Sequence, residues 1–265
     1  MYKTHRSKGL KENAHLRDSN LMFDEKSHTY TLNGVGELIS VTTLIQKFKK
    51  EFNSDETIEK FYTKWQQNAS SKYYGKTKEE IRGDWEDIRE DAARKGTELH
   101  RAIEDYYNDL KSSLETKEFG FFLDFDKEIQ QRLTPYRAEW RIYDENSLIA
   151  GTIDMLYEKK NTNEYVMFDW KRSAKVVNTF GEPIKKSYNN FFNPIDHLPD
   201  NRYFQYALQQ SVYKYILENK YGIKISSLNL LVLHPDYKKY FIIQTLPYLK
   251  DEVIRLIQYN KQGGL

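Results

Sequence analysis

Three strand-like segments lie close together in the middle of the chain, at residues 137–144, 147–158 and 164–171. Each is rich in apolar, β-branched and aromatic side chains, as buried strands are. The loop between the second and third segments, around residues 159–164, is nearly symmetric about its centre. We therefore predict that these two segments pair as an antiparallel hairpin within a central sheet.

Helical patterns flank these strands on both sides. An Asn33-Gly34 turn predicts an N-terminal β-hairpin, and Thr77 with Glu80 has the spacing of a capping box that opens a helix. Gly222 is expected to end a strong helix. The predicted helices span residues 41–52, 55–74, 77–110, 119–133, 201–222 and 249–260. Gly96 is a candidate break within the third helix, and Pro135 is expected to end the fourth. Two further strands are predicted within residues 227–235 and 238–246.

Helices before and after a mostly antiparallel sheet indicate a mixed α/β fold. No repeat or linker divides the 265 residues clearly. We expect a flexible basic arm over residues 1–20 and a single domain over residues 21–265. Within it, residues 21–91 would form the N-terminal hairpin and helices, and residues 92–265 the core.

Composition limits the chemistry that the chain can perform. Cysteine is absent, which excludes disulfides, thiol catalysis, iron–sulfur clusters and cysteine-based zinc sites. Any metal must then be held by oxygen or imidazole, which favours magnesium or manganese. No run approaches the roughly 18 apolar residues of a membrane span, and the polar N-terminus has no signal core. We therefore expect an intracellular protein that is neither secreted nor bound to a membrane.

Two aspartates, Asp154 and Asp169, lie inside otherwise apolar strand segments, where a carboxylate is buried only if something pairs with it. Strand alternation places Asp169 and Lys171 on one face. If Lys159 faces Glu164, then Asp154 lies opposite Asp169, where like charges are destabilising. A divalent cation between the two carboxylates would remove this conflict.

Each of these signals alone has a simpler reading. Asp154 can be an acid near a strand end, and Asp169 with Lys171 can form a cross-strand ion pair. His100 and Glu104 are four residues apart on a predicted helix and share a face, yet the histidine can be a hydrogen-bonded core residue. Gln209 and Tyr213 have the same spacing on another predicted helix, and they can belong to an ordinary amphipathic helix. The combination of hairpin, shared face and register is what favours a functional site.

The order of four motifs, GTELHRAIE, GTIDML, FDWK and a helix with Q-x-x-x-Y, resembles the RecB-like branch of the PD-(D/E)XK nucleases. That branch includes the mitochondrial genome-maintenance exonuclease and many viral and phage exonucleases. The resemblance covers roughly residues 92–234 and implies a restriction-endonuclease-like core. Ile153 stands where the PD motif has proline, and the cysteines of the iron–sulfur relatives are absent, which argues against that subgroup.

The resemblance also implies a role for individual residues. His100, Asp154 and Asp169, with the backbone carbonyl of Trp170, would hold one or two Mg²⁺ or Mn²⁺ ions, and Lys171 would be the catalytic lysine. Glu104 would contact a second ion or a water at the substrate. Further implied positions are Gln209 and Tyr213 at the edge of the site, and Glu139 as a further acidic position. Arg172, Lys175 and Arg202 lie near these motifs in sequence and are candidates for contacts with phosphates, or else belong to a solvated loop.

The expected activity is metal-dependent hydrolysis of DNA from free, single-stranded ends, in replication, recombination or repair. DNA is therefore the expected partner. Two alternatives remain open. One is an endonuclease that uses the same site on flaps or junctions, and the other is a non-catalytic protein that binds nucleic acid or assists assembly.

Overall fold

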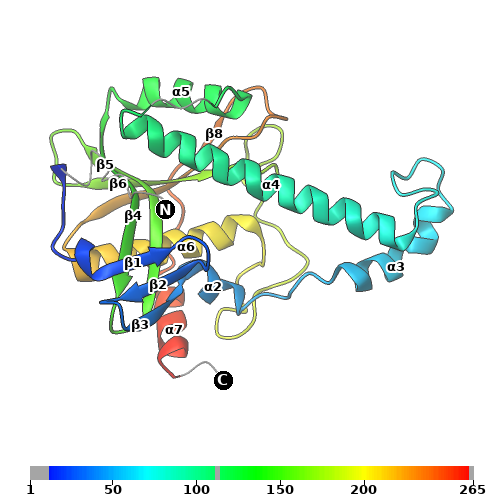
Figure 1. Ribbon diagram of the computed structural model, residues 1–265, viewed down its shortest axis with the longest axis horizontal. Helices are drawn as coiled ribbons and strands as arrows, with labels where there is room; N and C mark the ends of the chain where they lie inside the picture. Colours follow the sequence, from blue (N-terminus) through cyan, green and yellow to red (C-terminus); the bar gives the residue numbers. More distant parts are fainter. Residues whose placement is uncertain (1–11, 111–113, 263–265) are drawn as a thin grey trace. The chain divides into compact units, whose positions relative to one another are not determined.

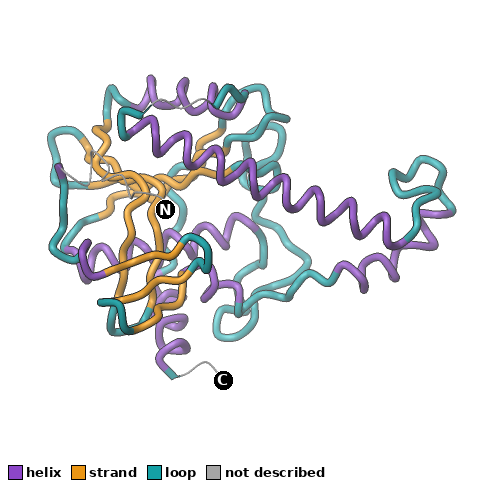
Figure 2. Tube along the Cα trace, viewed as in Figure 1, coloured by secondary structure: helices purple, strands orange, loops and turns teal. Residues whose placement is uncertain are grey.

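The computed structural model describes residues 12–110 and 114–262. Eight strands in this part of the chain form one mixed sheet, with helices on both of its faces (Figures 1 and 2). Five of the seven strand pairings are antiparallel; the exceptions are β3 with β5 and β6 with β7. The predicted class, an α/β fold with a mixed and mostly antiparallel sheet, is confirmed.

The strand order is β1-β2-β3-β5-β6-β7-β8, and β4 pairs with the other edge of β5. The strands are β1 (Leu21–Asp24), β2 (Thr29–Leu32), β3 (Gly36–Ser40), β4 (Leu133–Asp144), β5 (Ile149–Lys159), β6 (Tyr165–Lys171), β7 (Ile225–Val232) and β8 (Phe241–Ile243). The helices are η1 (Asp18–Asn20), α2 (Val41–Gln46), α3 (Ser54–Gln66), α4 (Lys78–Tyr107), α5 (Lys117–Ile129), α6 (Arg202–Ile216), η2 (Leu217–Tyr221) and α7 (Lys250–Lys261).

Three local predictions are confirmed by backbone and cap geometry. Asn33 and Gly34 both have positive φ, 52° and 72°, as a tight hairpin turn requires. The Thr77 hydroxyl accepts from the Glu80 N–H, while the Glu80 carboxylate accepts from the Thr77 N–H, which completes the capping box. Gly222, with φ of 68°, caps the helical segment that begins at Arg202.

The predicted helix break and the predicted helix stop are both wrong, and the helices predicted over residues 41–52 and 55–74 end early, at Gln46 and Gln66. Helix α4 runs through Gly96 without a break, because an isolated glycine costs a helix only about 1 kcal/mol. Pro135 does not end the preceding helix: α5 ends at Ile129, and Pro135 lies within β4 at a shift of register. Proline is tolerated in a strand at such an irregularity.

The described chain divides into two compact units. One comprises the N-terminal segment up to Lys49 together with the residues from Leu99 onward, and the other comprises Lys50–Glu98. The N-terminal hairpin belongs with the first unit because β3 pairs with β5 and so joins the central sheet. The second unit contains α3 and the first part of α4.

Residues 12–20, part of the expected arm, are held against β4. Asp18 receives the guanidinium of Arg137 at 2.7 Å and the indole N–H of Trp140 at 2.9 Å. The side-chain amide of Asn13 donates to the carbonyl of Tyr136. The rest of that expected arm, residues 1–11, lies outside the described residues.

The sheet is buried on both faces within the first unit. One core cluster joins it to α2, α6 and α7, and includes Met167, Ala207 and Leu256. The other joins it to α5 and the end of α4, and includes Phe122 and Trp170. Figure 1 shows α5 and α6 on opposite sides of the strands. No helix in the described ranges is long and apolar enough to span a membrane.

Candidate active site

Along one edge of β5, the neighbouring strand changes from β3 to β6. Strand β4 pairs along the other edge of β5 over its whole length. The first edge pairs with β3 only at Ile149 and Ala150, and with β6 only from Met155 to Glu158. Residues 151–154 therefore have no strand neighbour on that edge within the described part of the chain. Such a gap leaves backbone and side-chain groups available for a site.

The register of the β5–β6 hairpin is the predicted one. Met155 faces Phe168 and Glu158 faces Tyr165, and the Lys159 N–H donates to the carbonyl of Glu164. The ladder stops one pair before the two aspartates. In place of a backbone bond, Oδ2 of Asp154 accepts from the N–H of Trp170 at 2.7 Å. The carboxylate of Asp154 is thus oriented by the opposing strand at the point where the strands separate.

Glu139 faces Asp154 from the other edge of β5. The neighbouring pairs Ala138 with Met155 and Trp140 with Ile153 place it directly opposite. Glu139 has φ of 46°, a conformation that a non-glycine residue in a strand rarely adopts. Residues two apart in a strand normally share a face, yet Ala138 and Trp140 pack into different core clusters. The face of β4 that points to a given core cluster therefore changes at Glu139, the residue opposite Asp154.

His100 reaches these carboxylates from α4. Its Nδ1 lies 3.6 Å from Oδ2 of Asp154 and 3.7 Å from Oε1 of Glu139. Its Nε2 lies 3.0 Å from the carbonyl oxygen of Trp170. A carbonyl that accepts from one ring nitrogen fixes the ring and leaves the other nitrogen for a ligand. In this arrangement the Trp170 carbonyl orients His100. The resemblance to the nuclease family implies a different role, in which this carbonyl contacts the metal directly.

Asp169 and Lys171 form a close ion pair beside this group. Nζ of Lys171 lies 2.5 Å from Oδ2 of Asp169 and 4.8 Å from the centre of the Tyr206 ring. Val166, Phe168 and Trp170 all pack into the cluster with α5. Lys171 instead contacts Tyr206 on α6. The predicted alternation of faces along β6 therefore holds.

Gln209 and Tyr213 meet on α6 as their spacing predicts, with the amide of Gln209 donating to the Tyr213 hydroxyl at 3.1 Å. The Tyr213 ring lies against β5 at Gly151. A Cβ on Gly151 would stand 2.4 Å from Cε1 of this ring. Gly151 and Tyr206 are two residues at the site whose roles the sequence did not reveal. The GTID motif contained the relevant signal, a glycine inside a strand, which often marks a close approach.

The remaining predicted positions differ in their surroundings. Glu104 lies one turn after His100 and is half-buried, and burial is the main cause that raises its pKa. Arg172 forms an ion pair with Glu118 of α5 at 2.6 Å, so its guanidinium is already engaged. Lys175 and Arg202 are exposed. The structure therefore places Glu104 one turn from His100, where its charge adds to the larger effect of burial in raising the pKa of Glu139, but ties Arg172 into the packing of α5.

The electrostatics of the site are dominated by burial and by mutual charge. Burial by itself lowers the pKa of His100, but Asp154 and Glu139 outweigh it and raise this pKa to about 9. Burial, followed by the charge of Asp154, raises the pKa of Asp169 to about 7. Burial also raises the pKa values of Glu139 and Asp154. The pKa of Lys171 is raised, since Asp169 and Asp154 outweigh the opposing effect of burial.

The donor atoms fit a hard divalent cation. One ligand atom each from His100, Glu139 and Asp154 lie within 4.8 Å of one another, a spacing that ligands at about 2.0–2.6 Å from one ion can meet. Oε1 of Glu139 and Oδ1 of Asp169 are buried without a hydrogen-bond partner in the described part of the chain. Asp169 lies outside this group of three, whereas Glu139, which was predicted as a further acidic position, lies within it.

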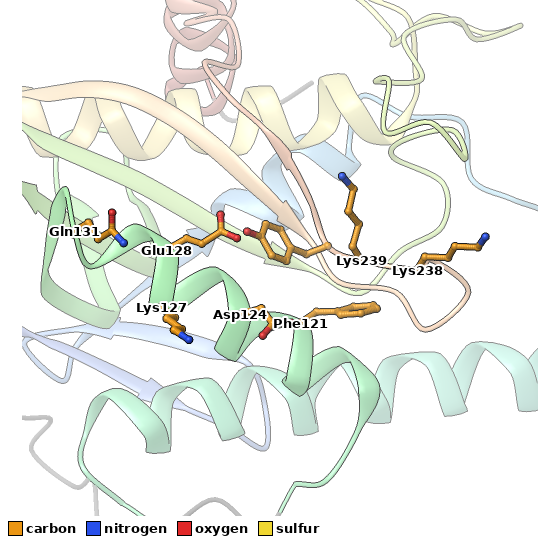
Figure 3. A pocket seen from close by; sticks show the side chains of 8 residues that line it. Phe121, Asp124, Lys127, Glu128, Gln131, Lys238 and Lys239 are labelled. Atoms are coloured by element: carbon orange, nitrogen blue, oxygen red, sulfur yellow. The ribbon is translucent and has the colours of Figure 1, made fainter.

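A cavity in the described residues lies away from this group. It has a volume of about 620 Å³ and lies between α5 and the segment that precedes β8 (Figure 3). Its lining includes Phe121, Glu128, Lys239 and Tyr240, and none of the candidate site residues. Because it mixes acidic and basic side chains, it does not single out a ligand.

Metal affinity should depend on pH in a direction set by these pKa values. A ligand histidine must lose its proton, and a ligand carboxylate must be ionised. Below pH 7 both His100 and Asp169 hold a proton, and between pH 7 and 9 His100 still does. We expect the Mn²⁺ affinity to rise with pH up to about pH 9, by up to about tenfold per pH unit between pH 7 and 9. Calorimetry in two buffers of different ionisation enthalpy would count the protons released. Affinity that is constant from pH 6 to 9 would contradict the assignment of His100 as a ligand.

Replacing Gly151 by alanine should destabilise the protein, because the added Cβ would collide with the buried Tyr213 ring. We expect a loss of about 1–3 kcal/mol in the free energy of unfolding, measured by chemical denaturation. Gly120→Ala is the matched control, since nothing lies within 4 Å of a Cβ there and alanine favours the helix by up to about 1 kcal/mol. Equal effects of the two variants would show that Tyr213 does not pack on Gly151.

Comparison with known proteins assigns no family. No family model matches the chain, and no curated protein matches it. Among solved structures, the crystal structure of SSO0001 is similar over 84% of this chain and 74% of that chain, with 14% sequence identity and a TM-score of 0.27. A likeness of that degree carries no argument about fold or function.

Proposed function

We propose that the chain is a metal-dependent deoxyribonuclease that degrades DNA from free, single-stranded ends. The observation that carries the proposal is the meeting of His100, Glu139 and Asp154 within 4.8 Å, beside the ion pair of Asp169 with Lys171. Oxygen and imidazole donors suit magnesium or manganese. A half-buried lysine held beside paired carboxylates suits a reaction that builds negative charge on a phosphate.

His100, Glu139 and Asp154 would hold the cation, and Oδ1 of Asp169 is free to join them. When bound, a divalent cation lowers the pKa of water and neutralises phosphoryl oxygens. Lys171 remains protonated because its pKa is raised. Its protonated amine would offset the negative charge that develops on the phosphate and help to position the attacking water. Tyr206 and Asp169 hold its amine in place.

Burial limits the access of water to the two aspartates, whereas the histidine is partly exposed. Asp169 is 2% exposed and Asp154 is 8% exposed, so their charges act in a medium of low dielectric constant. The His100 side chain is 29% exposed, which leaves one open side for a substrate phosphate. We also propose that the protein acts inside the cell, because DNA is its proposed substrate.

The decisive experiment compares linear and circular DNA. The purified chain with Mg²⁺ should release nucleotides from end-labelled linear single-stranded DNA and leave covalently closed single-stranded circles intact. EDTA should abolish the release. Cleavage of circles would favour an endonuclease that acts on flaps or junctions, and absence of any cleavage with Mg²⁺ or Mn²⁺ would contradict the proposal.

A further inference from the structure

The charges in the second unit are strongly segregated along the sequence. Residues 60–78, here called the tip segment, contain five lysines and no aspartate or glutamate. The rest of that unit, residues 50–59 and 79–98, contains twelve acidic and five basic residues. The tip segment comprises the second half of α3, the loop that follows and the first residue of α4. The segregation gives a nearly neutral unit one basic end.

Among the described residues, three of the five lysines have no acidic partner. Lys76 pairs with Asp84 and Lys78 with Glu59. Lys60, Lys64 and Lys72 are exposed and make no ion pair with a carboxylate in the described part of the chain. Unpaired lysines on one short segment are the usual means of binding consecutive phosphates.

Aromatic rings lie among these lysines. Nζ of Lys60 lies 5.5 Å from the centre of the Phe61 ring, and Nζ of Lys72 lies 4.8 Å from that of Tyr73. Phe61 is 36% exposed; Tyr73 is half-buried, and its neighbour in sequence, Tyr74, is 54% exposed. Exposed rings beside cations provide faces on which unpaired bases stack while the cations contact the backbone. Duplex DNA offers no unpaired base faces, so the rings favour single strands.

The loop of the tip segment is already formed. The Gln66 side chain donates to the carbonyls of Tyr73 and Lys76 and accepts from the N–H of Gly75, at 2.9–3.1 Å. The indole N–H of Trp85 donates to the Tyr73 hydroxyl at 2.7 Å. A loop that is ordered before binding loses little entropy when a ligand arrives. The tip segment is thus a preformed surface, distinct in sequence from the candidate active site.

We propose that the tip segment binds single-stranded DNA, with Lys60, Lys64 and Lys72 on phosphates and Phe61 and Tyr74 stacked on bases. That the strand is DNA rests on the proposed function, whereas the chemistry of binding rests on the tip segment alone. The proposal adds a binding surface for the substrate outside the first unit. It requires no assumption about how the two units are placed.

Binding can be measured separately from cleavage. The full chain carrying Asp154→Asn, in EDTA, is titrated into a fluorescent 20-nucleotide oligothymidylate, and anisotropy is recorded over a range of salt concentrations. The triple change of Lys60, Lys64 and Lys72 to glutamine should weaken binding on the order of 100-fold at 0.1 M salt and reduce the slope of log K against log salt by about 2, since each single-strand phosphate contact contributes about 0.7. Tyr74→Ala should weaken single-strand binding roughly tenfold and leave duplex binding unchanged.

The control variant also loses three lysine charges, but outside the tip segment. Lys127, Lys238 and Lys239 are exposed, and their triple change to glutamine should leave single-strand affinity nearly unchanged. Thermal unfolding confirms that each variant is folded. Equal losses in the two triple variants, or tighter binding of duplex or of an RNA of the same length, would overturn the proposal. Because no step needs turnover, a failed nuclease assay with intact single-strand binding would reject only the proposed catalysis.

Discussion

Replacing Asp154 by asparagine should abolish magnesium-dependent DNA cleavage, with a fall in rate on the order of 10³-fold or more. Asparagine keeps the size of the side chain and an oxygen that can accept from the Trp170 N–H, but it loses the charge that a cation requires. The fold should persist, because burial disfavours the ionised form of this carboxyl group. Cleavage of end-labelled DNA and thermal unfolding would be measured on the same preparation.

Lys171→Met is the matched comparison for Asp154→Asn. Methionine preserves much of the apolar length of lysine without the amine, so cleavage should also be lost while Mn²⁺ still binds. The Asp154→Asn variant should lose both. Full cleavage by either variant would show that this cluster does not catalyse the reaction.

Glu139→Gly should raise stability while it removes metal binding. A non-glycine residue at a positive φ costs roughly 1–3 kcal/mol, and Glu139 has φ of 46°. Glycine relieves that strain and removes a buried carboxylate oxygen that has no hydrogen-bond partner in the described part of the chain. Its own entropic cost offsets part of the gain. We expect an increase of about 1 kcal/mol in the free energy of unfolding, with Mn²⁺ affinity reduced at least tenfold.

Glu139→Gln separates strain from charge. Glutamine keeps the side-chain length and the same unfavourable backbone conformation, so metal binding should fall without the gain in stability. Denaturant unfolding and Mn²⁺ calorimetry report the two effects independently. If Glu139→Gly is destabilising by more than Glu139→Gln, the strained conformation is not what limits stability at this position.

The hairpin that carries the site could be predicted because its signals are local. Alternation of faces follows from strand geometry, and the symmetric loop between β5 and β6 sets the pairing of Lys159 with Glu164. The capping box at Thr77 and the stop at Gly222 are likewise decided by neighbouring residues. Such interactions are short in sequence, so composition and spacing suffice to find them.

Other parts of the site depend on segments far apart in the chain. The gap on β5 arises because β3 and β6 share one of its edges, and β3 lies more than 100 residues earlier. The positive φ of Glu139 has no signal in the sequence, since glutamate does not favour that conformation. The ion pair of Arg172 also has no local signal in the sequence, because its partner Glu118 lies on α5.

The α/β class, the β5–β6 register and the common face of Asp169 and Lys171 could be predicted from the order of the residues, because each follows from backbone periodicity and short loops. Three other features are seen only in the folded protein: Glu139 joins His100 and Asp154, Tyr213 lies on Gly151, and residues 50–98 form a separate unit. Those features are set by the pairing of distant strands and by packing between helices and the sheet, and neither leaves a local pattern in the chain.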